Sequence, residues 1–259
     1  PEDKVCLCSP ETATASALTG EITDPRDLEM DYPSFDDSRS FHVDDRNILP
    51  PAAHPELTVV EKGPNIITLP DFNGLPDRLE APVLLKVGDN ISTDEILPAG
   101  SKILPYRSNI PKISEFTYVR VDPSYPERAM KYQDSGSLIV GGDNYGQGSS
   151  REHAALAPRY LGVRAVIAKS YSRIHWQNLC NFGVLPLRFG KAEDYDDIRQ
   201  EDVLALDDLT KAVEKGNAIK ATNQRTGKTY ELIHDLSDRQ VRMVLKGGLL
   251  AMMRESLAA

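Results

Sequence analysis

Hydrophobic residues change their pattern sharply at about residue 80. After that point, short apolar runs typical of buried β-strands alternate with longer segments whose apolar residues recur at helical spacing. The expected strands are 81–87, 136–142, 163–170 and 184–189, the expected helices are 151–162, 171–183 and 237–257, and residues 217–232 form an expected hairpin. Strands that alternate with helices indicate an α/β fold with a mixed sheet and flanking helices.

The segment before residue 80 has almost no hydrophobic periodicity. A short helix is expected near the start, where Ser9 can cap it, Pro10 suits its first turn and Gly20 suits its end. Residues 25–82 then contain nine of the 18 prolines, together with pairs of aspartates. Such a composition cannot bury enough apolar area to offset the entropy lost on ordering. The chain is therefore divided into residues 1–23, an extended linker over 24–79 and a folded domain over 80–259.

The composition constrains the partners. A net charge of −9 and a pI near 5.1 argue against nucleic acid or an anionic membrane as the main partner. No apolar run approaches the ~20 residues that a membrane-spanning helix needs, and the first residues lack a signal-peptide core. The chain has no initiating Met, which favours a processed chain or a fragment of a longer protein.

Cysteine use points to a reducing compartment. Cys6, Cys8 and Cys180 are too few for a disulfide framework, which fits the cytosol or an organelle matrix. We expect a cytoplasmic location and leave the mitochondrial matrix open. Two thiols separated by one residue are a weak metal signal, so Cys6 and Cys8 are interpreted as ordinary buried cysteines, and no metal ligand is assigned within this chain.

The sequence GGDNYGQGSSREHAAL, residues 141–156, is the strongest chemical signal in the chain. A strand, a glycine-rich loop and a helix in succession can hold an anion, because the first N–H groups of a helix have no helical partner and its dipole favours negative charge. The three glycines after residue 141 let the backbone approach a ligand, and Arg151 adds a planar fork suited to a carboxylate or phosphate. The simpler alternative is a tight turn in which Ser149 or Ser150 caps the helix.

Known nucleotide and hydrolase motifs do not fit this loop. It lacks the Lys that follows the second glycine of a P-loop, and its glycines do not have G-x-G-x-x-G spacing. A hydrolase elbow needs Gly two residues after its nucleophile, where this chain has Arg151. A small carboxylate is therefore the favoured ligand.

Four segments carry a resemblance to a known family. They are SPETATASALTG, DNISTDEILPAG, NYGQGSSREHAALAPRYLG and AVIAKSYSRIHWQNLCNFGVLPL. The last three resemble the C-terminal, swivelling domain of the aconitase family, and the first is similar to the helix that ends the preceding, cluster-bearing domain. The resemblance covers most of residues 80–235 and roughly the first 25. Gly-Ser-Ser-Arg-Glu-His is shared with isopropylmalate dehydratases and homoaconitases, whereas the flanking Tyr-Gly-Gln-Gly and Ala-Ala-Leu favour aconitase.

The resemblance implies a swivelling β/β/α domain and a complete enzyme that interconverts citrate and isocitrate through cis-aconitate, together with N-terminal domains of the same protein. It implies that Ser149 is the base that removes the carbon-bound proton, and that Ser150 and Arg151 bind substrate oxygens. Arg107 in LPYRSN, after one extra residue, is the nearest match to another carboxylate-binding arginine, and Asp94 matches an aspartate that supports a histidine of another domain. The implied [4Fe-4S] cluster is ligated by cysteines outside this chain.

Two alternatives stay open at this point. The chain can belong to an isopropylmalate or homoaconitate dehydratase, or be its small subunit; an apolar residue at the position of Arg107 would favour that interpretation. It can also be a non-catalytic carboxylate-binding module that kept the fold, although the intact Ser-Ser-Arg sequence argues against this. His153 and His175 are interpreted as histidines with local structural contacts, and Glu95 stands where mitochondrial-type enzymes carry His.

Overall fold

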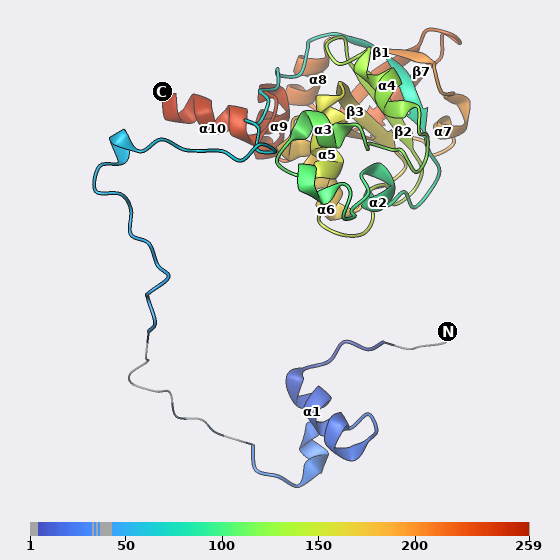
Figure 1. Cartoon of the computed structure of the whole chain (residues 1–259). Helices are drawn as coiled ribbons and strands as arrows, with labels where there is room; N and C mark the ends of the chain where they lie inside the picture. The colour runs from blue at the N-terminus through green and yellow to red at the C-terminus, as the bar shows by residue number, and fades with distance from the viewer. Residues whose placement is uncertain (1–4, 33, 35, 37–42, 259) are drawn as a thin grey trace. The chain divides into compact units, whose positions relative to one another are not determined.

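The computed structural model describes residues 5–32, 34, 36 and 43–258 (Figure 1). The chain divides into two compact units with the boundary between Val59 and Val60.

The first unit is built around the predicted short helix, α1 (Pro10–Thr19). Ser9 accepts a hydrogen bond from the backbone N–H of Thr12 at 3.2 Å, and Gly20 ends the helix with a φ of 81°. Two 3₁₀ turns follow, η1 (Pro25–Leu28) and η2 (Pro55–Leu57). Among the described residues of this unit, Ala15 is the only buried hydrophobic one, so they form no core of their own.

The last residues of the expected linker belong to the second unit. Leu75 is buried there, and its backbone N–H donates to the carbonyl of Leu245 at 3.2 Å. The wider interpretation of residues 24–79 as a linker stays a prediction.

The sheet of the second unit is mixed and closes on itself. Around the barrel the strands are β1 (Leu79–Lys86), β2 (Ser137–Gly141), β3 (Val163–Ala168), β4 (Leu185–Phe189), β7 (Thr229–Ile233), β6 (Ala218–Asn223) and β5 (Val203–Leu206). β1 to β4 pair in parallel, and the remaining pairs, including β5 with β1, are antiparallel. The α/β class with a mixed sheet is confirmed. The closure was not predicted, because β5 is short and pairs with a strand far away in the sequence.

Helices cover the sheet from outside. They are α2 (Thr93–Ile96), α3 (Ile110–Ser114), α4 (Tyr125–Met130), α5 (His153–Tyr160), α6 (Arg173–Asn181), α7 (Asp194–Asp197), α8 (Leu209–Lys215), α9 (Asp238–Lys246) and α10 (Leu249–Ala258), with the 3₁₀ turn η3 (Leu104–Tyr106) between α2 and α3. α5 packs between α3 and α6, and α6 in turn contacts α9 (Figure 1). The predicted terminal helix is broken at Gly247, whose φ of 87° ends α9.

Alternating strand residues divide the core into two clusters. On β2, Leu138 and Val140 contribute to one cluster, whereas Ile139 belongs to the other. On β3, Ile167 and Val166 divide in the same way. This alternation follows from the two-residue period of a strand: one set of side chains packs inside the barrel, and the other packs under the helices.

The carboxyl ends of β1, β2 and β3 lie at one edge of the barrel, because they are neighbouring parallel strands. The loops that follow them are joined by backbone hydrogen bonds, from Gly142 N–H to the carbonyl of Gly88 at 3.1 Å and from Lys169 N–H to the carbonyl of Gly142 at 3.2 Å. Two segments singled out in the sequence, DNISTDE and GGDNYGQGSSRE, therefore meet at this edge.

Candidate functional site

The glycine-rich loop is bonded directly to the loop that follows β1. Gly146 N–H donates to the carbonyl of Ile91 at 2.7 Å, and Gln147 N–H donates to the same carbonyl at 3.1 Å. In return, Thr93 N–H donates to the carbonyl of Gln147 at 2.9 Å. Gly146 has a φ of 77°, a left-handed conformation that favours glycine. These bonds fix the position of the loop backbone just before its two serines.

A short capped helix, α2, presents Asp94 at this junction. Ser92 Oγ accepts from Glu95 N–H at 3.2 Å, and Glu95 Oε2 accepts from Ser92 N–H at 2.8 Å, which together form a capping box. Glu95 therefore has a local structural partner in Ser92.

Asp94 and Arg151 form the central ion pair of the site. Arg151 Nη1 donates to Asp94 Oδ1 at 2.7 Å and to the carbonyl of Leu97 at 2.9 Å. The side chain of Arg151 is 18% exposed and that of Asp94 is 51% exposed. The hydrogen bond from Arg151 is the main cause that holds the pKa of Asp94 below its usual range, and the charge of Arg120 acts in the same direction.

Ser149 and Ser150 are exposed at the end of the loop, beside this ion pair. Thr93 Oγ1 donates to the carbonyl of Ser149 at 3.3 Å. α5 begins only at His153, and its N-cap is Glu152 without a side-chain capping bond. The alternative in which either serine merely caps this helix is therefore wrong. The helix was predicted to begin at Arg151, and it begins two residues later, at His153.

Arg107 directly follows η3 and lies beside the first residue of α5. His153 Nε2 donates to the Arg107 carbonyl at 2.7 Å, which confirms the local structural contact expected for His153. The exposed Arg107 lines an open groove of about 460 Å³ with Ser101 and Leu104. The structure thus bonds Asp94 directly to Arg151 and holds the Ser149 carbonyl on Thr93, the residue before Asp94. The Arg107 carbonyl contacts His153, two residues after Arg151. Among the described residues, the Arg107 side chain has no hydrogen-bond partner.

The sequence did not indicate that His175 and Tyr145 pack against the glycine-rich loop. His175 is 1% exposed, and a Cβ at Gly146 would overlap its ring. Tyr145 packs on the same ring, with centroids 5.4 Å apart. Packing in the core was predicted for His175, but the satisfied polar contact was not found, because neither ring nitrogen has a hydrogen-bond partner in the described part of the chain.

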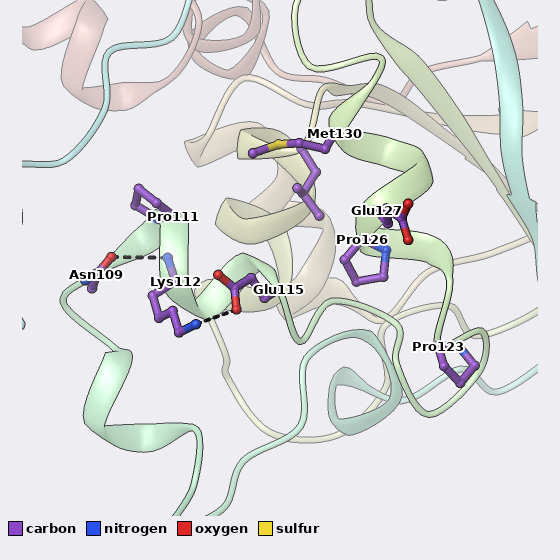
Figure 2. Close-up of a pocket in the computed structure, with 9 residues that line it drawn as sticks. Asn109, Pro111, Lys112, Glu115, Pro123, Pro126, Glu127 and Met130 are labelled. Carbon is purple, nitrogen blue, oxygen red and sulfur yellow. Dashed lines mark hydrogen bonds and ion pairs between the residues drawn. The ribbon is translucent and has the colours of Figure 1, made fainter.

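A second groove, of about 690 Å³, lies between α3 and α4 and contains none of the candidate site residues (Figure 2). Figure 2 shows Glu115, directly after α3, on one side of this groove and Pro126 and Met130 of α4 on the other. Lys112 Nζ is already paired with Glu115 Oε2 at 2.7 Å. The groove therefore offers less to a carboxylate than the edge that carries Arg151.

The described residues of this chain do not fit an iron–sulfur cluster. Cys6 and Cys8 are exposed, and Cys180 is buried, with burial raising the pKa of its thiol to about 12. The expectation that Cys6 and Cys8 are buried is wrong, because the first unit has no core to bury them. Within the described ranges, no group of three or more His, Cys, Asp or Glu side chains could hold a metal ion.

Comparisons with known proteins agree with this arrangement. Residues 105–192 match the family model of the aconitase C-terminal domain. The chain is 39% identical over 175 residues to the 3-isopropylmalate dehydratase small subunit of Aquifex aeolicus, covering 94% of that protein and 67% of this chain. The chain belongs to the aconitase family.

Longer members of the aconitase family extend the match. A putative mitochondrial aconitate hydratase of Emericella nidulans is 33% identical over 287 residues, which cover 94% of this chain and 36% of that protein. The chain thus spans just over a third of the length of the aconitate hydratases it matches. The crystal structure of 3-isopropylmalate dehydratase from Methanocaldococcus jannaschii superposes with a TM-score of 0.56 at 26% identity, covering 96% of that chain and 70% of this one.

The names of these relatives are of two kinds, aconitate hydratase and 3-isopropylmalate dehydratase small subunit. Among the helices of the described residues, none is long and apolar enough to cross a membrane.

Proposed function

We propose that this chain is the C-terminal part of an aconitate hydratase that interconverts citrate and isocitrate through cis-aconitate. Its partners would be these acids and the N-terminal domains of the same enzyme. The observation that carries the proposal is the half-bonded guanidinium of Arg151 beside two exposed serines. The match to aconitate hydratases includes the first unit, because it covers 94% of the chain, whereas the match to the isopropylmalate dehydratase small subunit covers 67%.

Arg151 is suited to bind a substrate carboxylate. Its Nη1 is occupied by Asp94 and by the Leu97 carbonyl, which fix the plane of the guanidinium. Among the described residues, Nε and Nη2 of Arg151 have no hydrogen-bond partner, and these two nitrogens form the edge that matches a carboxylate with two parallel bonds. Asp94 thus orients Arg151, and by resemblance it would also support a histidine of another domain.

Ser149 is proposed as the base for the carbon-bound proton, and this requires strong stabilisation of its alkoxide. A helix N-terminus contributes at most ~2 kcal/mol, or roughly 1.5 pKa units. α5 begins four residues after Ser149, so its dipole supplies less than this. A preorganised donor in a site closed to water can contribute ~2.7–4 kcal/mol. Arg151 and loop N–H groups must therefore provide most of the stabilisation, after the domain has closed over the substrate.

Ser150 and Arg107 complete the proposed binding set. Ser150 is exposed between the proposed base and Arg151, where its hydroxyl can reach a substrate oxygen. Arg107 lines the open groove beside η3 and would bind a second carboxylate. The cluster that the resemblance implies would be ligated by cysteines outside this chain, since the described residues do not fit it.

Isopropylmalate dehydratase is the second candidate, favoured by the 39% identity to a small subunit of that enzyme. Its substrate has an apolar branch, whereas this groove carries the exposed Arg107. Turnover of citrate and of isopropylmalate by the complete enzyme separates these two candidates, and a protein that binds carboxylates without turnover would be the non-catalytic module. The names of several aconitate hydratase relatives include "mitochondrial", so the organelle matrix is the proposed location alongside the expected cytoplasm.

The decisive experiment is Ser149→Ala in the complete enzyme. If Ser149 is the base, its oxygen matters chiefly in the transition state, so kcat should fall by about 10²–10⁴-fold or more while KM changes little. The matched control is Ser237→Ala, because Ser237 is a true N-cap that accepts from Gln240 N–H. That variant should lose about 1 kcal/mol of stability and keep its kcat. A Ser149→Ala enzyme with near-normal kcat would remove the assignment of the base.

A further inference from the structure

His175 is a buried titratable residue that the proposed reaction does not use. It lies in the first turn of α6 and is 1% exposed. Burial lowers its pKa from an ordinary 6.5 to about 4, so the imidazole is neutral at neutral pH. Both ring nitrogens lack a hydrogen-bond partner in the described part of the chain, which is unusual for a buried polar side chain.

The ring of His175 packs directly against the backbone of the glycine-rich loop. Its Cβ, Cγ and Cδ2 occupy the space that a Cβ at Gly146 would need, so backbone and ring are in close contact there. Tyr145 covers the ring at a tilt of 56°. Backbone hydrogen bonds of 3.0 Å join Tyr145 to Ser170 and Ser172, so the start of α6 and the loop are held together.

The two halves of the Ser-Ser-Arg sequence are therefore held by different contacts. Arg151 is fixed by Asp94 and by the carbonyl of Leu97, both on the α2 side. Gly146, three residues before Ser149, rests on His175 of α6. A change at His175 should therefore move the serine while the arginine stays in place.

We propose that His175 is a positioning residue of the site. Its imidazole ring fixes the position of the Gly146 backbone and, through it, the position of Ser149. This inference rests on the proposed function, in which Ser149 removes a proton from the substrate. Its predicted signature is an effect on kcat that exceeds the effect on KM, because Arg151 keeps its own anchors.

The contact also makes the loop sensitive to acid. The side chain that faces the ring from the loop is Tyr145, whose pKa is raised by burial and which is therefore neutral throughout the acid range. Burial alone lowers the pKa of His175, and no charged group of the described residues contributes. Protonation would place a charge in this position without a partner, which favours opening of the loop.

The test uses three variants of the complete enzyme. His175→Ala should lower kcat about 100-fold, as expected when a reacting group is displaced by about 1 Å, with KM changed by less than about threefold. His175→Phe keeps a ring of similar size and should keep kcat within about fivefold, since volume-conserving changes are tolerated best. It should also lose the acid limb of the kcat profile that protonation of His175 produces. Leu179→Ala, one turn further along α6 and equally buried, is the matched control: it should lower the thermal midpoint and leave kcat unchanged.

Two outcomes would overturn the proposal. One is a His175→Ala enzyme whose thermal midpoint falls but whose kcat per folded molecule is that of the wild type. The other is a folded His175→Phe enzyme that loses as much kcat as His175→Ala, because the ring's shape would then not be what matters.

A substrate-free measurement separates this proposal from the proposed function. In NMR spectra of the 259-residue chain, the amide signals of Gly146, Gly148 and Ser149 should shift more in His175→Ala than in Leu179→Ala. Equal shifts would contradict the positioning role even in an active aconitase. Larger shifts together with a fully active Ser149→Ala enzyme would retain the role of His175 for the loop and reject the base.

Discussion

Two aspartate–arginine pairs in the second unit have opposite burial. In the pair at the candidate site, Arg151 is 18% exposed and Asp94 is 51% exposed. In the second pair, Asp202 directly before β5 is 3% exposed and Arg225 in the β6–β7 turn is 41% exposed. Asp202 accepts from both Nε and Nη2 of Arg225, from Asn223 Nδ2 at 2.7 Å and from Arg199 N–H at 2.9 Å.

The difference shows which pair has capacity left for a ligand. Asp202 is saturated by four hydrogen bonds, and Arg225 uses its planar edge on that carboxylate, so this pair ties the β6–β7 turn to β5. Arg151 donates to the protein only through Nη1, and its Nε and Nη2 have no hydrogen-bond partner among the described residues. The same two residue types thus act as a structural clamp in one place and as an oriented binding group in the other.

Arg151→Lys should have the largest effect and would break the comparison most directly. Lysine keeps the charge but loses the two-pronged edge, so kcat/KM of the complete enzyme should fall about 10²–10³-fold, or ~3–4 kcal/mol of transition-state stabilisation. Steady-state kinetics with citrate and with isocitrate measure this loss.

Arg225→Lys is the matched control, because it makes the same chemical change in the saturated pair. It should lower the free energy of unfolding by about 1–2 kcal/mol and leave kcat/KM unchanged, since Arg225 is proposed to bind only the protein. If both variants lost stability and neither lost activity, Arg151 would be a second structural clamp.

Asp202→Asn should have the next largest effect, on stability alone. The amide keeps one acceptor but loses the charge that Arg225 neutralises, so the free energy of unfolding should fall by about 2–3 kcal/mol. The pKa of Asp202 is lowered in the fold, mainly by the hydrogen bonds from Arg225. Its contribution is therefore fully present above the ordinary pKa of about 3.8 and is lost as pH falls toward the lower folded value.

Urea unfolding of the chain from pH 7 down to pH 2.5 tests the sign of this effect. The difference between wild type and Asp202→Asn should be constant above about pH 5 and should shrink below about pH 3.8. A difference that grows on acidification would contradict the lowered pKa. His175 acts in a different window: its lowered pKa removes stability between pH 6.5 and about 4 in both proteins, so it cancels in the difference.

Sequence patterns predicted the parts of this fold that depend on local signals. The caps of α1, the existence of strands β1 to β4 and the β6–β7 hairpin follow from turn residues and apolar runs. The short helices α2, α3 and α4 were not predicted, because four to six residues are too few for a helical period to appear. β5 and the barrel closure depend on pairing between distant segments, which no local pattern contains.

The candidate site divides in the same way. The glycine-rich loop and its Ser-Ser-Arg sequence were visible, but the bond between Asp94 and Arg151 joins residues 57 positions apart. The support from His175 was also missed, because a histidine in an amphipathic helix carries no signal of which loop it will contact. Whether the five candidate residues act as the resemblance implies stays a prediction.

Asp94→Asn is expected to have the smallest effect. It tests the half-exposed carboxylate of the Asp94–Arg151 pair, as Asp202→Asn tests the buried carboxylate of the other pair. Asn keeps an oxygen that can accept from Arg151 Nη1, and the Leu97 carbonyl still holds the same nitrogen, so the guanidinium should stay near its place. An ion pair with a half-exposed carboxylate contributes about 1 kcal/mol or less. The thermal midpoint should therefore change little, and KM should rise about tenfold as the fork loses orientation, with kcat reduced less. A kcat loss of several orders of magnitude at unchanged KM would show instead that Asp94 acts mainly on the histidine of another domain, and that the carbonyl of Leu97 alone is sufficient to orient Arg151.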